Sequence, residues 1–256
     1  MPAPSDPTRV VTADVELTVN GRRLALRVSV PEGRVSPREL LPVFRGVAER
    51  LTALAVDAAR AAGHHVSCRK GCGACCRQLV PISALEAREL VRLVGQMPEP
   101  RRTLIRQRFA DARRRLEAEA PGMLDRLLRP QDCASDEIVA LGRHYASLGI
   151  ACPFLEDESC SIYSDRPVDC RQYLVVSDPR HCADPGSEQV RAITPWGGPV
   201  SAGIPAGEST PEGKPVTWVP LALAPDFVTR YPREPQPRPG PHMVEEFFSR
   251  FGRGGA

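Results

Sequence analysis

The sequence predicts a mainly α-helical protein with a small N-terminal β-hairpin and irregular, cysteine-rich metal-binding loops. Apolar residues alternate with polar ones between residues 13 and 30, which is typical of strands. Between residues 42 and 148 they recur three or four positions apart, which is typical of helices. Most of the nine cysteines fall in two blocks, 68–76 and 152–182. At 256 residues the chain can bury a core without disulfides, so size alone does not explain these cysteines.

The segment 1–35 is expected to form the hairpin. Valine and leucine alternate with other residues in two runs, 15–19 and 24–30, on either side of Asn20-Gly21. An Asn-Gly pair adopts the positive φ angles that a type I′ turn needs. Two antiparallel strands joined by this tight turn are therefore predicted.

The segment 36–186 is expected to be a helical domain that carries the metal-binding cysteines. Ser36 and Glu39 fit a capping box, and Pro42 marks the restart of a long helix that Gly63 ends. Ser83 and Glu86 form a second capping box. The predicted helices are 42–62, 83–94, 101–120, 122–129 and 135–148.

The segment 187–256 has a different composition. Proline and glycine are frequent between residues 195 and 241, and aromatic residues are sparse. Only 216–228 has the pattern of an ordered segment, and 244–251 has that of a short terminal helix. We expect a partly ordered C-terminal region.

The first cysteine block reads Cys68-Arg-Lys-Gly-Cys72-Gly-Ala-Cys75-Cys76. Metal chelation requires several thiolates within a few ångströms of one another, and the glycines on either side of Cys72 let the backbone fold back to achieve this. Adjacent side chains such as those of Cys75 and Cys76 tend to diverge. They are therefore expected to serve different metal ions, or different irons of one cluster.

The second block begins at Cys152, about 75 residues after the first, so metal binding would close a long loop and couple ligation to folding. A zinc ion takes four ligands, and so does a 4Fe-4S cluster. The cysteines therefore suggest two centres, or one centre and a redox-active or structural remainder. The expected ligands are Cys68, Cys72, Cys75, Cys76, Cys152, Cys160, Cys170 and Cys182, and the expected cofactor is Zn²⁺ or an iron-sulfur cluster.

These blocks resemble the YkgJ-like cysteine-cluster family, which is described as zinc- or iron-chelating and named for a Cys-x2-Cys-x2-Cys-Cys signature. The resemblance covers about residues 64–185, although the spacing from Cys68 to Cys72 is one residue longer than in the name. It rests on Gly71-Cys72-Gly-Ala-Cys75-Cys76, Val80-Pro81-Ile82-Ser83 with Glu86-Ala87, Cys152-Pro153-Phe154-Leu155, Cys160-Ser-Ile-Tyr163 and Arg166-Pro167-x-x-Cys170-Arg171. A flagellin lysine N-methylase group lies within this family, so the resemblance also implies an enzymatic alternative.

Four further residues near the blocks are expected to play lesser roles. Cys133 lies outside every matched motif and is interpreted as a partly buried thiol. His64, His65 and His181 adjoin the cysteines, but such histidines are more often solvated or hydrogen-bonded to a ligand than ligands themselves.

Two functional classes stay open beside metal binding. One is a cluster-dependent enzyme, such as a protein lysine N-methyltransferase or a redox catalyst, although no nucleotide-binding or hydrolase motif is found. The other is a nucleic-acid-binding module that uses the arginines of 101–115. Acidic residues interrupt that run and the formal charge is only +3, so a solvated helix face is favoured and nucleic acid is disfavoured. A protein partner is left open.

The first ten residues contain no basic stretch leading into an apolar run, so no secretory signal is expected. No window approaches the roughly 20 apolar residues of a membrane span, and no membrane partner is expected. We therefore interpret the protein as cytoplasmic. Thiols are kept reduced in that compartment, which favours metal or redox chemistry over disulfides.

Overall fold

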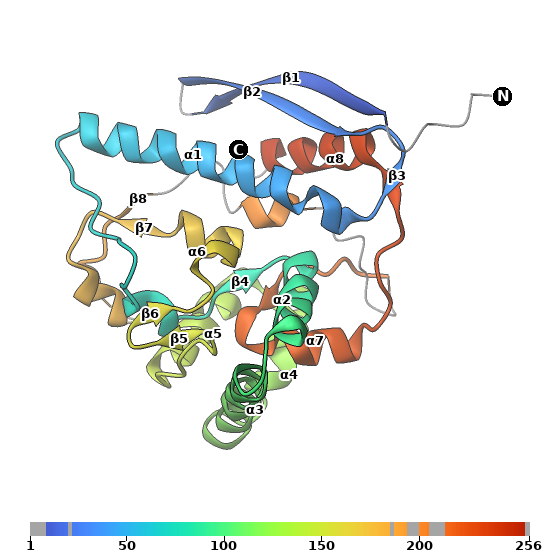
Figure 1. Ribbon diagram of the computed structural model, residues 1–256. Helices are drawn as coiled ribbons and strands as arrows, with labels where there is room; N and C mark the ends of the chain where they lie inside the picture. Colours follow the sequence, from blue (N-terminus) through green and yellow to red (C-terminus); the bar gives the residue numbers. More distant parts are fainter. Residues whose placement is uncertain (1–8, 20–21, 185–186, 194–199, 205–212, 254–256) are drawn as a thin grey trace.

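The computed structural model describes residues 9–19, 22–184, 187–193, 200–204 and 213–253. It confirms the predicted class, because helices predominate, a β-hairpin forms the N-terminal end and the cysteines lie in irregular regions (Figure 1). The division into three segments remains a prediction.

The hairpin consists of β1 (Val10–Val19) and β2 (Arg22–Pro31), which pair antiparallel with Val15 opposite Leu26. The Asn20-Gly21 turn lies outside the described residues. Leu26, Val28 and Val30 alternate along β2 and are buried, so one face of the hairpin is apolar. Figure 1 shows the hairpin lying over α1 (Leu41–Ala61) and α8 (Gly240–Arg253), which bury that face.

The start of α1 follows the expected pattern. The Ser36 N–H donates to Glu39 Oε1 over 2.8 Å, and a 3₁₀ turn, η1 (Pro37–Leu40), leads into the helix. Pro42 lies in the first turn of α1, where no intrahelical donor is lost. Phe44 of α1 stacks on Phe247 of α8 with ring centroids 4.7 Å apart. This pair belongs to the core that the hairpin covers.

Four helices form the middle of the predicted helical segment. They are α2 (Ala84–Gln96), α3 (Arg101–Glu119), α4 (Met123–Leu127) and α5 (Ser135–Ser147). A second core lies between α2, α3 and α7 (Ala224–Arg230), and a third lies around α4 and α5. The second core also includes Phe154 and Ile162, which flank cysteines of the second block.

Short strand pairs join segments that are far apart in sequence. Three of them pair antiparallel across long separations: β3 (Arg34–Val35) with β10 (Arg238–Pro239), β4 (Pro81–Ile82) with β9 (Val219–Pro220), and β7 (Leu174–Val175) with β8 (Ala192–Ile193). The fourth, β5 (Leu155–Glu156) with β6 (Ser159–Cys160), is a local hairpin. Among the remaining elements are the short helix α6 (Val168–Gln172) and the 3₁₀ turns η2 (Ala74–Arg77), η3 (Pro130–Asp132), η4 (Tyr163–Asp165), η5 (Pro179–Ala183), η6 (Val200–Gly203) and η7 (Leu221–Leu223).

In the described part of the chain, no helix has both the length and the apolar character needed to cross a membrane.

Candidate metal centre

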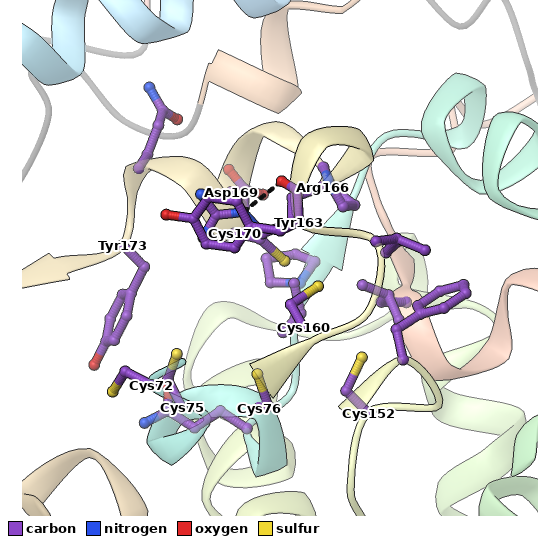
Figure 2. Close-up of a pocket in the computed structure, with 18 of the residues that line it drawn as sticks. Cys72, Cys75, Cys76, Cys152, Cys160, Tyr163, Arg166, Asp169, Cys170 and Tyr173 are labelled. Atoms are coloured by element: carbon purple, nitrogen blue, oxygen red, sulfur yellow. Dashed lines mark hydrogen bonds between the residues drawn. The ribbon is translucent and has the colours of Figure 1, made fainter. Parts of the chain in front are cut away.

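Cysteines from both blocks line one cavity of about 370 Å³. Figure 2 shows Cys75 and Cys76 on one side of this hollow, Cys160 and Cys170 on the other, and Cys152 beside them. All nine cysteines are free thiols. The cysteines in the cavity wall are Cys72, Cys75, Cys76, Cys152, Cys160 and Cys170. Six of the eight expected ligands therefore share one space.

The first block turns twice around Cys72. Gly71 has φ +87°, a value that favours glycine over residues with a side chain. Gly73 is required for a different reason: a Cβ atom there would lie 2.7 Å from Leu155 Cδ1 and 2.9 Å from the Glu158 carbonyl oxygen. The chain then enters η2, which carries Cys75 and Cys76. Gly71 is thus favoured by its backbone conformation, whereas Gly73 is required by the close approach of the β5–β6 hairpin.

The second block is joined directly to the first. The backbone N–H of Cys152 donates to the carbonyl oxygen of Cys76 over 2.7 Å. After Cys152 the chain forms the β5–β6 hairpin, which ends at Cys160. The hairpin packs on Gly73, as the short distances to Leu155 and Glu158 show. Segments 76 positions apart are therefore held together by backbone contacts.

Cys68 and Cys182 lie next to this cavity without lining it. The Val175 N–H of β7 donates to Cys68 Sγ over 3.3 Å, and Gln78 Nε2 donates to the Cys182 carbonyl oxygen over 2.9 Å. Cys182 is buried on η5, which packs against η2. Cys68 is thus joined to β7, and Cys182 lies on the turn that packs against η2.

Two arginines of α3 hold the second block by its backbone. Arg101 Nη2 donates to the Ser161 carbonyl oxygen over 2.9 Å. Arg108 Nη1 donates to the Pro153 carbonyl oxygen over 3.2 Å and also contacts Glu156 Oε1 at 3.3 Å. These side chains were not among the residues that the sequence singles out for the site. Their spacing of seven positions places them on one helix face, which is the only sequence signal for the shared role.

Arg166 brings a positive charge to the cavity wall. Its guanidinium lies 3.6 Å from the centre of the Tyr163 ring, and its Nε donates to the Tyr163 carbonyl oxygen over 3.1 Å (Figure 2). Both contacts fix the side chain beside the thiols. Burial raises the pKa of Cys160, and the interaction with Cys76 raises that of Cys75; the charge of Arg166 favours both thiolate forms and offsets part of each rise.

Burial and mutual repulsion nevertheless raise most of the thiol pKa values. Burial raises the pKa of Cys152 to about 12 and that of Cys182 to about 11. Burial also raises the pKa of Cys170, with further contributions from the charges of neighbouring cysteines. For Cys75 the largest cause of the raised pKa is its interaction with the Cys76 side chain, followed by burial. Cys75 and Cys76 thus interact, and both line the cavity.

The thiolate forms are also supported by backbone donors. The N–H groups of Phe154 and Ile162 donate to the sulfurs of Cys152 and Cys160, each two residues earlier, and both bonds lower the thiol pKa. Such N–H bonds to sulfur stabilise the charged form that binds a metal. A cation would neutralise the repulsion that raises the pKa values. The donor set, made of thiols with N–H groups aimed at them, therefore fits a thiolate-bound metal.

The sulfurs lie near one another but are not yet arranged around a common point as the ligands of a metal ion would be. Among the described residues, no three cysteine, histidine, aspartate or glutamate side chains are already placed as ligands of one metal ion. His64, His65 and His181 do not line the cavity, and His65 lies with Cys68 along a separate pocket. Cys133 does not line it either, and its thiol instead lies 3.9 Å from the Arg126 carbonyl oxygen.

The structure also brings in a buried carboxylate, Glu86, which the sequence marks as a capping residue and as part of a family motif but not as a contact of the second block. Glu86 accepts the N–H of Val168, the first residue of α6, and α6 carries Cys170. Next to Cys170, burial raises the pKa of Asp169 to about 7, and its carboxyl group accepts the Ser201 hydroxyl over 2.7 Å. The spacing of Ser83 and Glu86 predicts the capping contact between these two residues, but neither the bond from Val168 nor the environment of Asp169.

Together these features describe a cysteine-lined site on a helical scaffold. Such a site is typical of metal-chelating domains. Residues 67–184 match the model of the CxxCxxCC family, whose description is "putative zinc- or iron-chelating domain". This match supports the resemblance of residues 67–184 to the cysteine-cluster family. No curated protein and no solved structure matches the chain significantly.

Proposed function

We propose that the protein binds zinc or an iron-sulfur cluster through thiolates from both cysteine blocks. The observation that carries this proposal is the single cavity lined by cysteines of both blocks. Thiolates select zinc and iron-sulfur clusters over harder ions such as Mg²⁺ and Ca²⁺. No histidine lines the cavity among the described residues, so a Cys/His site has less support than an all-cysteine one.

The neighbours of each thiol support two groups of ligands. Besides burial, the nearby charges of Cys75, Cys68 and Cys72 raise the pKa of Cys182. The pKa of Cys170 is raised by burial and by the charges of a different set, Cys152, Cys75 and Cys160. Cys75 is common to both sets, and Cys76 follows it in η2. We propose that Cys68, Cys72 and Cys182 bind one centre and that Cys152, Cys160 and Cys170 bind another. Each centre takes its fourth ligand from the adjacent pair, one from Cys75 and the other from Cys76.

The chain's own groups prepare the thiols for this role. The N–H groups of Val175, Phe154 and Ile162 donate to three of the sulfurs and hold their orientation. Arg166 offsets part of the negative charge that several thiolates bring together. A bound metal would supply the remaining positive charge and link the two blocks.

Anaerobic purification, metal analysis and a visible absorption spectrum test this function. We expect either a coloured protein with iron and acid-labile sulfide or a colourless one with stoichiometric zinc. Cys152→Ser should lower the metal content, whereas Cys133→Ser, the matched control outside the cavity, should not. A chain that binds neither metal, or a Cys152→Ser variant that binds as much as the parent, would contradict the proposal.

A cluster-dependent enzyme, either a redox catalyst or a protein lysine N-methyltransferase, is a second candidate. One observation favours it: the cavity continues past the sulfurs to an apolar wall that includes Val80 and Leu221, with Tyr163 and Tyr173 beside it. Its volume of about 370 Å³ lies in the range of small-molecule sites, roughly 300–1,000 Å³. A reversible redox titration of the metal-loaded protein tests the redox form, and methyl transfer from S-adenosylmethionine to a lysine peptide tests the other.

A further inference from the structure

Glu86 is a buried carboxylate that joins two helix starts. Its side chain is at the N-terminal end of α2, and the residue is only 1% exposed. One oxygen, Oε2, accepts the Ser83 N–H over 3.0 Å and the Ser83 hydroxyl over 2.9 Å. The other, Oε1, accepts the Val168 N–H over 2.7 Å. The bond from the Ser83 N–H belongs to the expected capping box, in which the Glu86 N–H in turn donates to the Ser83 hydroxyl over 3.2 Å. The bond from the Val168 N–H reaches a segment 82 positions away.

The bond from the Val168 N–H lies between the two cysteine blocks. Glu86 follows Cys76 by ten positions, by way of β4 and the start of α2. Val168 precedes Cys170 by two positions and opens α6, which packs beside β4. Because α6 is only five residues long, its orientation depends on how its first residue is held. The Glu86 carboxylate is thus a short connection from one block to the other.

We propose that Glu86 is a positioning residue that fixes Cys170 relative to the first cysteine block. This inference rests on the proposed metal-binding function. A buried carboxylate is costly unless hydrogen bonds compensate it, and here three donors do so. An ordinary capping box needs only the contacts to Ser83, and it forms without burial at Ser36 and Glu39.

A carboxylate is suited to this position because it has two acceptor oxygens and no donor. A glutamine has one acceptor oxygen and an NH₂ group. In Glu86→Gln that NH₂ group faces either the donors of Ser83 or the N–H of Val168, so one of the two helix starts loses its partner. We therefore expect α6 to be held less firmly, and Cys170 to be less well placed.

Metal affinity, measured by competition with a chromophoric chelator, is the test. Partners that orient metal ligands typically change the affinity about 10–100-fold when they are mutated. We expect a loss of this size for Glu86→Gln, together with an altered visible or Co²⁺-substituted spectrum. Glu39→Gln is the matched control, because it removes a capping-box carboxylate of η1 that touches neither block. It should keep the parent affinity and spectrum.

A second variant tests the same bond from its other end. Val168→Pro removes the donor, and proline is tolerated here because Val168 is the first residue of α6 and Pro167 has an extended conformation (φ −54°, ψ 159°). Val168→Ala keeps the N–H while it also reduces the side chain. We expect a loss of affinity in Val168→Pro and not in Val168→Ala. This comparison decides the matter even if Glu86→Gln does not fold.

The outcomes separate this inference from the proposed function. If the parent chain binds no metal, the proposed function fails and the inference with it. If the parent binds metal but Glu86→Gln and Val168→Pro do so with equal affinity and an unchanged spectrum, only the role of Glu86 is wrong. Equal losses in Val168→Pro and Val168→Ala would also overturn it, because packing and not the N–H would then matter.

Discussion

Arg77 and Glu158 form a two-point ion pair, with Nη2 to Oε1 at 2.6 Å and Nη1 to Oε2 at 3.1 Å. Arg77 follows Cys76, and Glu158 lies in the turn of the β5–β6 hairpin, two positions before Cys160. Both side chains are substantially exposed, so the pair contributes little stability by itself. The β5–β6 hairpin therefore contacts the first block at two places, through Glu158 in its turn and through the Cys152 N–H before its first strand.

The hairpin also packs closely on Gly73, so Gly73→Ala should displace it. The added Cβ would lie 2.9 Å from the Glu158 carbonyl oxygen, which is backbone and cannot rotate away. We expect a loss of about 1–3 kcal/mol in the free energy of unfolding, measured in urea, as for other overpacked sites. Gly46→Ala in α1, where an added Cβ would meet nothing within 4 Å beyond the adjacent residues and the helix's own backbone, is the control. Equal stabilities of Gly73→Ala and the parent would show that the hairpin is not held against Gly73.

Arg108 should matter for the second cysteine block because it holds the Pro153 carbonyl oxygen. Arg108→Ala should lower the free energy of unfolding by about 1–2 kcal/mol, the range for a hydrogen bond that involves a charged group. Hydrogen exchange of the β5–β6 amides should become faster. Arg114→Ala is the control, since Arg114 on the same helix pairs with exposed Asp111. If the β5–β6 amides exchange at the same rate in both variants, Arg108 does not stabilise the second cysteine block.

Metal removal should destabilise the chain more than any single surface substitution. Metal binding favours the folded state because the unfolded chain does not hold both cysteine blocks together. With free metal at 100 times its dissociation constant, we expect the free energy of unfolding to rise by about 2.7 kcal/mol over the chelator-treated sample. Thermal unfolding with and without chelator measures this. An identical transition in both samples would argue against ligands from both blocks.

The core under the hairpin should be energetically separate from the cysteine site. Phe44 is fully buried and stacks on Phe247, so Phe44→Ala should cost about 3–5 kcal/mol. We expect unchanged metal stoichiometry in the folded fraction, because neither ring lines the cavity. Chemical unfolding followed by metal analysis checks both quantities. Loss of metal in proportion to lost stability would instead show that the two regions are coupled.

Asp178 gives a defined pH dependence. Hydrogen bonds from the Arg180 side chain and backbone lower the pKa of Asp178 from 3.8 to about 2. A lowered carboxyl pKa contributes stability above the unfolded value of 3.8, and this contribution is lost as the pH falls through about 2. The parent should therefore be more stable than Asp178→Asn at pH 6 but not at pH 2. Urea unfolding at both pH values, with chelator present throughout, makes the comparison.

Local patterns predicted much of the fold. The alternation in 15–19 and 24–30 gave the hairpin strands, and the capping boxes at Ser36 and Ser83 gave two helix starts within one or two residues. These signals involve neighbours in the sequence. The pairing of β4 with β9 could not be predicted, because two-residue strands carry no periodic pattern.

For the site, spacing indicated which residues matter but not how they are held. The cysteine blocks stand out in the sequence, and six of their members line one cavity. The supporting contacts of Glu86 and Arg108 depend on tertiary packing, and neither residue differs in its local pattern from a surface cap or a surface arginine. The arginines of α3 were interpreted as a solvated face. Arg113 does pair with Glu117 and Asp226, whereas Arg101 and Arg108 bind the backbone of the second block.

The pairing of β4 with β9 has a practical consequence for anyone who wishes to isolate the cysteine domain. Leu221, which follows β9 and donates its N–H to the Val80 carbonyl oxygen, forms part of the cavity wall. A fragment trimmed to the family boundaries at residue 184 would lack this wall and would leave Ile82 and Phe154 open to water. Expression of such a fragment should yield aggregates, and its failure to take up metal would say nothing about the intact chain.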